Sequence, residues 1–207
     1  MLPVLNQELK KYNDSSIVPL IETFFNKNEA GGRYLLLLQE IKGSLVIDHI
    51  TIRCLNIEER AKEFLTTGYV DKNEKVEYPD QGWWAKVYRK AGYPAMFIDQ
   101  AYSDEKGNRS PLAPWVKKFG DQVLHHVAVR VGNIDQTKKA LEQKGVEFSG
   151  DIVGEKGTRL RQVFTAAELK DGMAFTVLEL TERNNYEGFY PEQADSLMKS
   201  STKTKTV

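Results

Sequence analysis

The chain has 207 residues, a length that suits one ordinary domain or two small packed modules. Hydrophobic residues make up 41% and charged residues 28%, and 29 basic residues balance 29 acidic ones, so the formal net charge is zero. This balance gives no reason to expect nucleic acid or an anionic membrane as a partner. Cys54 is the single cysteine, which excludes an intrachain disulfide and disfavours a cysteine-based metal site.

Residues 1–42 predict a helical extension. Apolar side chains between Val18 and Phe25 recur at helical spacing, and Gly31-Gly32 is expected to break this run before a second apolar stretch. The first dozen residues carry charges and contain no long apolar run, so we expect neither a signal peptide nor a membrane helix. A cytoplasmic location follows as the default expectation.

Residues 43–120 and 121–190 predict two copies of one module, each with a strand, a helix and three further strands. The first copy opens with VIDHITIRC, continues with the helical IEERAKEFLTT, and has strand candidates YVDKNEKVEY, GWWAKVYRK and PAMFIDQAY. The second opens with VLHHVAVRV, continues with IDQTKKALEQK, and has strand candidates VEFSGDIV, TRLRQVFT and AFTVLELTE. The predicted fold is α+β, with two tandem βαβββ modules forming an open metal-binding barrel. Residues 191–207 are predicted to form a C-terminal helix and a disordered tail.

Aligning the two copies brings chemically similar residues to the same position. DHITIR over HHVAVR places His49 over His126 and Arg53 over Arg130, about 77 residues apart. FIDQ over VLEL places Asp99 over Glu179.

The matched histidines predict a metal site. A single strand histidine is usually structural, but His49 and His126 occupy one position of both copies, and neutral imidazole is the commonest metal ligand. Glu179 lies inside an apolar strand, where an unpaired buried carboxylate is costly, so it is predicted as the third ligand; the alternative is a salt bridge to Arg159 or Arg161. Two histidines and one carboxylate are the ligand set favoured by non-heme Fe(II).

Further polar residues are candidates for the same site. Arg53 and Arg130 follow their histidines by four residues, so each could bind a substrate carboxylate in bidentate fashion or lie ion-paired at a strand end. Gln162 is expected to make polar contacts in the cavity. Asp99 is a candidate fourth ligand, or a solvated residue at a strand end. His125 faces away from His126 on a strand and is interpreted as structural or as a neighbour of the site.

The paired pattern with DHITIRC, HHVAVRV and FTVLELTER resembles the vicinal oxygen chelate superfamily over roughly residues 45 to 183. RQVFT, LELTER, YEGF and ADSLMKS resemble the C-terminal end of 4-hydroxyphenylpyruvate dioxygenases. The N-terminal helical segment before an Asp-His strand is similar to that of 2-oxoadipate dioxygenase/decarboxylases. The resemblance implies His49, His126 and Glu179 as ligands of Fe(2+) and Arg53 as the anchor of a substrate carboxylate; Zn(2+), Ni(2+), Co(2+) and Mn(2+) are alternative metals.

Three functions follow as expectations. The first is a metal-dependent dioxygenase that uses O2 and acts on a small 2-oxo acid or related carboxylate. The second is an isomerase, epimerase or lyase of the glyoxalase kind, which generally uses four protein ligands, so a metal contact of Asp99 would favour it. The third is a non-catalytic binding protein for small molecules on the same fold. A homodimer is one assembly considered.

Overall fold

The computed structural model describes residues 2–201 and confirms the α+β class. Within these residues the chain divides into two compact units. The central unit comprises residues 49–125, and the terminal unit comprises residues 2–48 and 126–201. The boundaries between the units lie inside two strands, β1 and β5, and the N-terminal helices belong to the terminal unit.

The central unit contains most of β1 (Ile47–Cys54), followed by α4 (Ile57–Thr66), β2 (Val70–Tyr78), η1 (Pro79–Gln81), β3 (Trp83–Arg89), β4 (Ala95–Ala101), η2 (Glu105–Arg109) and α5 (Leu112–Phe119). Its strands follow the order β2-β3-β4-β1. The β1–β4 pair is parallel, and β3 is antiparallel to both of its neighbours. The predicted βαβββ order is therefore present in this unit, while α5 was not predicted.

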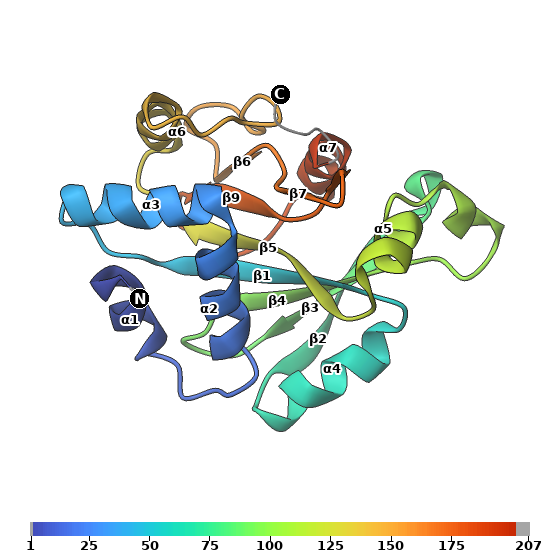
Figure 1. The fold of residues 1–207 in the computed structure, drawn as a ribbon. Helices are drawn as coiled ribbons and strands as arrows, with labels where there is room; N and C mark the ends of the chain where they lie inside the picture. Colours follow the sequence, from blue (N-terminus) through green and yellow to red (C-terminus); the bar gives the residue numbers. More distant parts are fainter. Residues whose placement is uncertain (1, 202–207) are drawn as a thin grey trace. The chain divides into compact units, whose positions relative to one another are not determined.

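The terminal unit contains α1 (Pro3–Leu9), α2 (Val18–Lys27), α3 (Glu29–Glu40), β5 (Val123–Arg130), α6 (Ile134–Gln143), β6 (Leu160–Phe164), β9 (Val177–Arg183) and α7 (Pro191–Ser200). Its strands β5, β9 and β6 are neighbours in that order, with β5–β9 parallel and β6–β9 antiparallel. A two-residue hairpin pair, β7 (Leu169–Lys170) and β8 (Met173–Ala174), lies between β6 and β9 in the chain. Helices α3 and α6 lie side by side in this unit (Figure 1).

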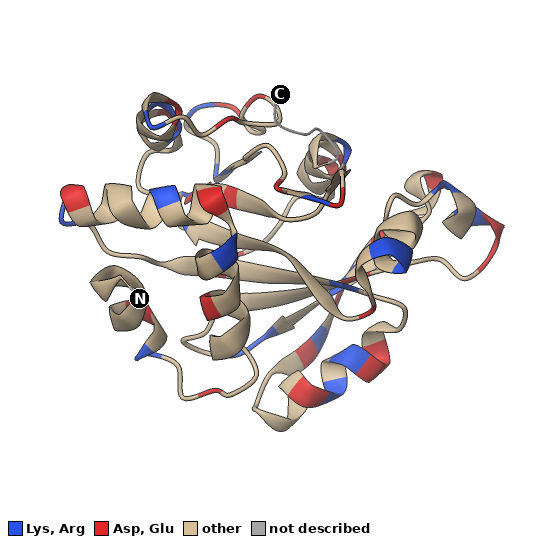
Figure 2. Ribbon diagram, viewed as in Figure 1, with Lys and Arg blue, Asp and Glu red and all other residues tan. Residues whose placement is uncertain are grey.

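The same helix start occurs in both units. The Asn56 side chain accepts a hydrogen bond from the Glu59 backbone N–H at the start of α4, and Asn133 does so from Gln136 at the start of α6. Asparagine is among the preferred N-cap residues because its side-chain oxygen satisfies an N–H that the helix leaves without an internal partner. Asn56 and Asn133 stand about 77 residues apart, as the histidines do, so the caps belong to the repeat. Acidic and basic residues alternate closely along α4 (Figure 2).

Two local predictions were wrong. The Gly31-Gly32 pair does not break a helix: α3 runs through it, and the break lies at Asn28, whose side chain accepts a hydrogen bond from the Gly31 N–H. A Cβ at Gly31 would lie 3.1 Å from the Phe25 ring, so glycine here permits close packing of α2 and α3. The strand predicted at residues 146–153 is reduced to two isolated bridges, at Phe148 and Val153.

The last helix covers part of the terminal core. Leu197 on α7 packs with Phe164, Ala167 and Val177. Helix α7 matches the helix predicted after residue 190. The predicted disordered tail falls on residues 202–207, outside the described part of the chain. Among residues 2–201, no helix combines the length and the hydropathy needed to cross a membrane. The expected cytoplasmic location stays a prediction.

Candidate metal centre

His126 and Glu179 lie together in the terminal unit. In the parallel register of β5 and β9, His126 pairs with Val177 and Ala128 with Glu179, so the ligand candidates are two residues apart along the ladder. His126 Nε2 lies 3.3 Å from Glu179 Oε2. Both residues are buried, and the Glu179 side chain is only 1% exposed. A buried carboxylate beside an imidazole nitrogen matches the donor chemistry of a divalent-metal site.

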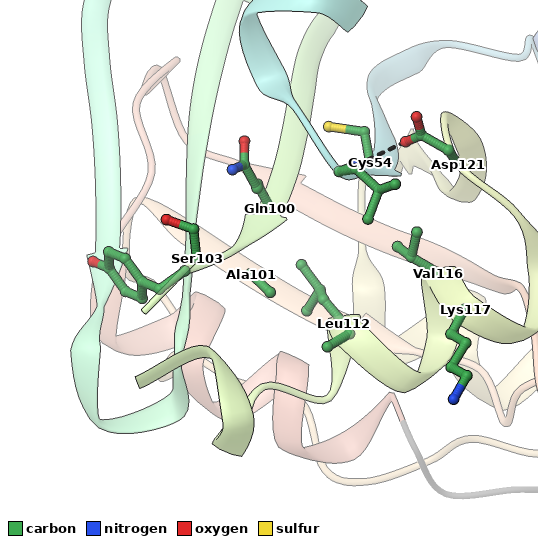
Figure 3. A pocket seen from close by; sticks show the side chains of 11 residues that line it. Cys54, Gln100, Ala101, Ser103, Leu112, Val116, Lys117 and Asp121 are labelled. Carbon is green, nitrogen blue, oxygen red and sulfur yellow. Dashed lines mark hydrogen bonds between the residues drawn. The ribbon is translucent and has the colours of Figure 1, made fainter. Parts of the chain in front are cut away.

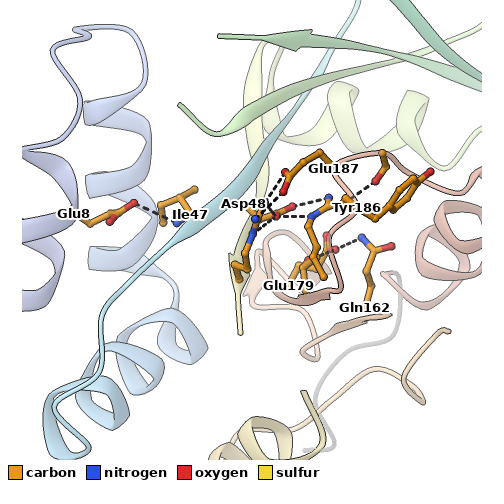
Figure 4. Close-up of polar contacts among 11 residues, drawn as sticks. Glu8, Ile47, Asp48, Gln162, Glu179, Tyr186 and Glu187 are labelled. Atoms are coloured by element: carbon orange, nitrogen blue, oxygen red, sulfur yellow. Dashed lines mark hydrogen bonds and ion pairs between the residues drawn. The ribbon is translucent and has the colours of Figure 1, made fainter. Parts of the chain in front are cut away.

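The second oxygen of Glu179 is occupied by two neutral donors. Gln162 Nε2 donates to Oε1 at 2.5 Å, and the Thr181 hydroxyl donates to the same oxygen at 3.0 Å. Figure 4 shows the Gln162 contact beside the ion pairs described below. The structure therefore places Gln162 against a predicted metal ligand. It also adds Thr181, which the sequence prediction missed although Thr181 follows Glu179 by two residues and so shares its strand face.

His49 lies on β1 in the central unit. It is buried, and its ring centroid is 5.0 Å from that of Phe97. His126 has a similar neighbour in its own unit, because its ring centroid lies 5.0 Å from that of Phe164. Among the residues that the structure describes, His49, His126 and Glu179 are the group of side chains that could hold a divalent metal ion.

The strand registers correct one part of the repeat alignment. His49 pairs with Ala95 in the β1–β4 ladder, whereas His126 pairs with Val177 in the β5–β9 ladder. Counting from these partners, the first-repeat equivalent of Glu179 is Phe97, and Asp99 corresponds to Thr181. The alignment of FIDQ with VLEL was wrong by two residues, since it matched chemical type and not register. Asp99 is thus not the counterpart of Glu179.

Arg53 and Asp99 are direct partners in the parallel β1–β4 register. Both are buried, and the Arg53 guanidinium lies 4.9 Å from the centroid of the Trp115 ring on α5. Burial raises the pKa of the Asp99 carboxyl to about 7, against the opposing effects of Arg53 and His49. Burial also lowers the pKa of Arg53 to about 10, against the effect of Asp99, so Arg53 remains protonated at neutral pH.

Arg130 takes a different position from its counterpart Arg53. Its Nε and Nη2 donate to Asp48 Oδ1 at 3.1 and 2.9 Å, and its Nη1 and Nη2 donate to Glu187 at 2.9 and 2.8 Å. Arg183 completes the cluster, with Nε and Nη2 donating to the two oxygens of Asp48 at 2.7 and 2.9 Å. Figure 4 shows Asp48 and Glu187 of this cluster. The structure therefore has the ion-paired arrangement for Arg130 that was the alternative to substrate binding.

Arg183 also holds the chain that follows β9. Its Nη1 donates to the backbone oxygens of Tyr186 and Gly188 at 3.0 and 2.7 Å, and its guanidinium lies 4.5 Å from the centroid of the Phe189 ring. The sequence prediction did not select Asp48 or Arg183. The available signal was Asp48 itself, a carboxylate that immediately precedes the metal-ligand candidate His49 in the predicted strand VIDHITIRC.

His125 packs within the central unit. Its ring meets Trp115 edge to face, with centroids 5.7 Å apart, and the residue is 2% exposed. His125 is therefore part of the packing around Trp115, and among the described residues the candidate metal group consists of His49, His126 and Glu179.

A separate pocket of about 490 Å³ lies in the central unit, beside the carboxyl-terminal ends of β1 and β4. Figure 3 shows Leu112 and Val116 of α5 on one side and Cys54 and Gln100 on the other. Neither Arg53 nor Asp99 lines it, because their side chains alternate with those of Cys54 and Gln100 along the strands. Burial, with Asp99 and Asp121 nearby, raises the pKa of the Cys54 thiol to about 12, so this thiol is neutral at pH 7.

Comparison by sequence gives no relatives: no protein-family model matches the chain, and no curated protein matches it. Comparison by structure finds similar proteins. Hydroxyglutarate synthase from Oryza sativa, solved in complex with 2-oxoadipate, is similar over 90% of both chains, with a TM-score of 0.73 and 18% identity. A glyoxalase superfamily protein from Ralstonia eutropha JMP134 is similar over 83% of both chains, with a TM-score of 0.64 and 13% identity.

A methylmalonyl-CoA epimerase is also similar, over 67% of this chain and 95% of the epimerase, with a TM-score of 0.50 and 26% identity. At these identities the likeness concerns the fold and not the reaction. The chain therefore has the fold of the vicinal oxygen chelate superfamily, which confirms the resemblance seen in its sequence.

Proposed function

We propose that this protein is a metal-dependent dioxygenase of the vicinal oxygen chelate type, acting on a small 2-oxo acid. The observation that carries the proposal is the candidate metal-binding group, which consists of two histidines and one carboxylate: His49, His126 and Glu179. This is the ligand set favoured by non-heme Fe(II) enzymes, and it leaves coordination positions for substrate and O2. Bound Fe(II) would supply O2 activation and chelation of the 2-oxo acid.

The side chains suit such an ion. One carboxylate and two neutral imidazoles leave a net positive charge on a bound divalent ion, which favours an anionic substrate. His49, His126 and Glu179 are all buried. Phe97 and Phe164 each lie beside one of the histidines, so apolar rings limit the access of competing water.

Arg53 is proposed as the residue that binds a substrate carboxylate. It lies on the same strand as His49 and four residues further on, so the two side chains share one face of β1. The pKa of the Asp99 carboxyl is raised to about 7, which weakens its negative charge beside Arg53 at neutral pH. The Arg53 guanidinium would attract a substrate carboxylate. Arg130 is not proposed for this role, because Asp48 and Glu187 already accept hydrogen bonds from its guanidinium.

An isomerase or epimerase is the second candidate, and one observation favours it. Asp99 is a buried carboxyl with a pKa of about 7, which is the range expected of a group that exchanges protons with a substrate at neutral pH. The structural similarity to a methylmalonyl-CoA epimerase agrees with this candidate at the level of the fold. In such an enzyme the metal would act as a Lewis acid, and O2 would not be consumed.

An oxygen-consumption assay separates the two candidates. The purified chain is loaded with Fe(II) under anaerobic conditions and mixed with 2-oxo acids, with 2-oxoadipate and monocarboxylic 2-oxo acids in separate reactions. The dioxygenase proposal predicts O2 uptake and stoichiometric CO2 release with at least one of them, and no O2 uptake by a Zn(II)-loaded sample. Metal-dependent turnover of substrate that proceeds equally well without O2 would overturn it and support the isomerase.

A further inference from the structure

The Glu179 carboxylate has two chemically distinct oxygens in the terminal unit. Oε1 accepts hydrogen bonds from Gln162 Nε2 at 2.5 Å and from the Thr181 hydroxyl at 3.0 Å. Oε2 instead faces His126 Nε2 at 3.3 Å. A carboxylate that binds a metal is ionised and only accepts hydrogen bonds, so in that state the Gln162 amide presents its NH2 group and Thr181 presents its hydroxyl hydrogen. The orientation of all three groups is therefore fixed by chemistry as well as by distance.

The strand register explains why these three side chains meet. In the antiparallel β6–β9 pair, Gln162 is the direct partner of Thr181, and Phe164 is the partner of Glu179. Glu179 and Thr181 are two residues apart on β9, so they share one face of the strand, and Gln162 is the diagonal neighbour of Glu179 on that face. All three are buried, at 4% or less exposure. Backbone pairing on both sides holds the donors in place.

We infer that Gln162 and Thr181 are positioning residues, which turn Glu179 so that Oε2 is the oxygen presented to the metal. This inference rests on the proposed function, because it assigns the two donors to the same metal-binding group. Both donors are neutral, so they orient the carboxylate without neutralising the charge that the metal needs. With Oε1 held by two hydrogen bonds, Glu179 would offer Oε2 to a bound ion.

The first repeat lacks the corresponding set. By register, the equivalents of Glu179, Thr181 and Gln162 are Phe97, Asp99 and Ala85. None of these can reproduce a carboxylate held by an amide and a hydroxyl. The set is therefore a specific feature of the second repeat, the repeat that supplies the carboxylate ligand, and not a general property of the fold.

Metal affinity tests the inference without relying on turnover. Thr181→Val and Gln162→Leu each remove one donor at nearly constant volume, and Thr181→Ser restores the hydroxyl. The titration uses Co2+ with the purified chain, since its visible absorption reports both occupancy and coordination geometry. Loss of a residue that orients a metal ligand typically weakens binding about 10–100-fold, and we expect this range for each single variant. Thr181→Ser is expected to bind as the native chain does, with the same absorption spectrum.

Thr165→Val is the matched control. Thr165 is another fully buried threonine of the terminal unit, but its hydroxyl accepts a hydrogen bond from the Leu178 N–H, whereas the Thr181 hydroxyl donates to Glu179. This variant should lose stability and keep the native Co2+ affinity. Thermal unfolding shows which variants are folded. Because the two donors lie on different strands, one folded variant is sufficient for the test. If Gln162→Leu does not fold, Gln162→Asn, whose amide is one methylene shorter, replaces it.

Native Co2+ affinity and spectrum in folded Thr181→Val and Gln162→Leu would overturn the inference while leaving the metal site intact. Equal weakening in Thr165→Val would also overturn it, since the effect would then be structural. A native chain that binds no Co2+ would instead contradict the proposed function itself, so the two failures are distinguishable.

Discussion

The two repeats carry the same strand motif but use it differently. In the central unit the arginine that follows the histidine by four residues, Arg53, is buried opposite Asp99 and lies over Trp115. In the terminal unit its counterpart Arg130 is half-exposed and bound by Asp48 and Glu187. The repeat therefore determines the position of each arginine on its strand, while the neighbouring residues determine what its side chain can bind.

The carboxylates differ in the same way. Asp99 pairs directly with Arg53 in the β1–β4 ladder. Glu179 pairs with Ala128 in the β5–β9 ladder, two residues before Arg130 and two residues after His126. Arg53 is therefore the charged partner of Asp99, whereas Glu179 faces His126 with Oε2 and two neutral donors with Oε1. A shift of two residues along a strand separates a carboxylate that pairs with arginine from one that suits a metal.

The largest expected effect concerns the adjacent histidines. His126→Ala should abolish metal binding, because it removes an imidazole of the proposed ligand group. His125→Ala should keep the metal and lose roughly 1–3 kcal/mol of unfolding free energy, because its ring packs on Trp115. Metal content of dialysed samples and denaturant unfolding measure the two quantities. The opposite pattern, with metal lost only in His125→Ala, would mean that the strand register of the site is wrong by one residue.

The next effect tests the ion-pair cluster of the terminal unit. Asp48→Ala leaves the buried guanidinium of Arg183 without its carboxylate partner, and breaking a buried pair in this way typically costs roughly 3–5 kcal/mol of stability. Glu187→Ala removes a partner whose side chain is 68% exposed, and should cost roughly 0–1 kcal/mol. Urea unfolding compares the two variants. Equal losses would show that burial does not distinguish the two carboxylates.

The Asp99 carboxyl predicts a pH dependence of stability in the metal-free chain. Its pKa is about 7 in the folded state and near 3.8 in the unfolded state, so between these values the folded state binds more protons. Stability contributed by this group is therefore full below pH ~4 and is lost as the pH rises to ~7, by at most about 4 kcal/mol. The unfolding free energy of Asp99→Asn should change less with pH over this interval than that of the native chain, when unfolding is measured at several pH values. Parallel profiles would contradict the raised pKa.

A smaller effect separates the two arginines in catalysis. Arg53→Lys should lower kcat/KM for the 2-oxo acid by about 10–100-fold with metal content unchanged, because lysine lacks the planar fork that binds a carboxylate. Arg130→Lys should leave kcat/KM close to native and reduce stability, since its partners are Asp48 and Glu187. Steady-state kinetics with metal analysis checks both. A larger kinetic effect in Arg130→Lys would reverse the assignment.

The sequence predicted much of this arrangement. Strand alternation and the matched histidines were enough to predict both repeats, the α+β fold and the candidate ligands, because a period of two defines which residues share a face. Register was beyond reach, since the loops between strands differ in length in the two repeats; Asp99 was therefore aligned with Glu179. The segment at residues 146–153 has the composition of a strand but forms only two bridges.

The partners of charged residues also required the structure. Asp48 lies 82 residues before Arg130 in the chain, and Glu187 lies 57 residues after it. Only the fold therefore brings these carboxylates, and Arg183 with them, to Arg130. Thr181 could have been identified from its spacing to Glu179, but a threonine in a strand has no distinctive pattern of its own.

The central claim is that Glu179 binds the metal and Asp99 does not. A Co2+ titration of the native chain, Glu179→Gln and Asp99→Asn, each monitored by visible absorption, tests it most directly. We predict one ion per native chain, the same stoichiometry in Asp99→Asn, and no binding by Glu179→Gln at concentrations that saturate the native protein. Native binding by Glu179→Gln, or loss of the ion in Asp99→Asn, would contradict the account.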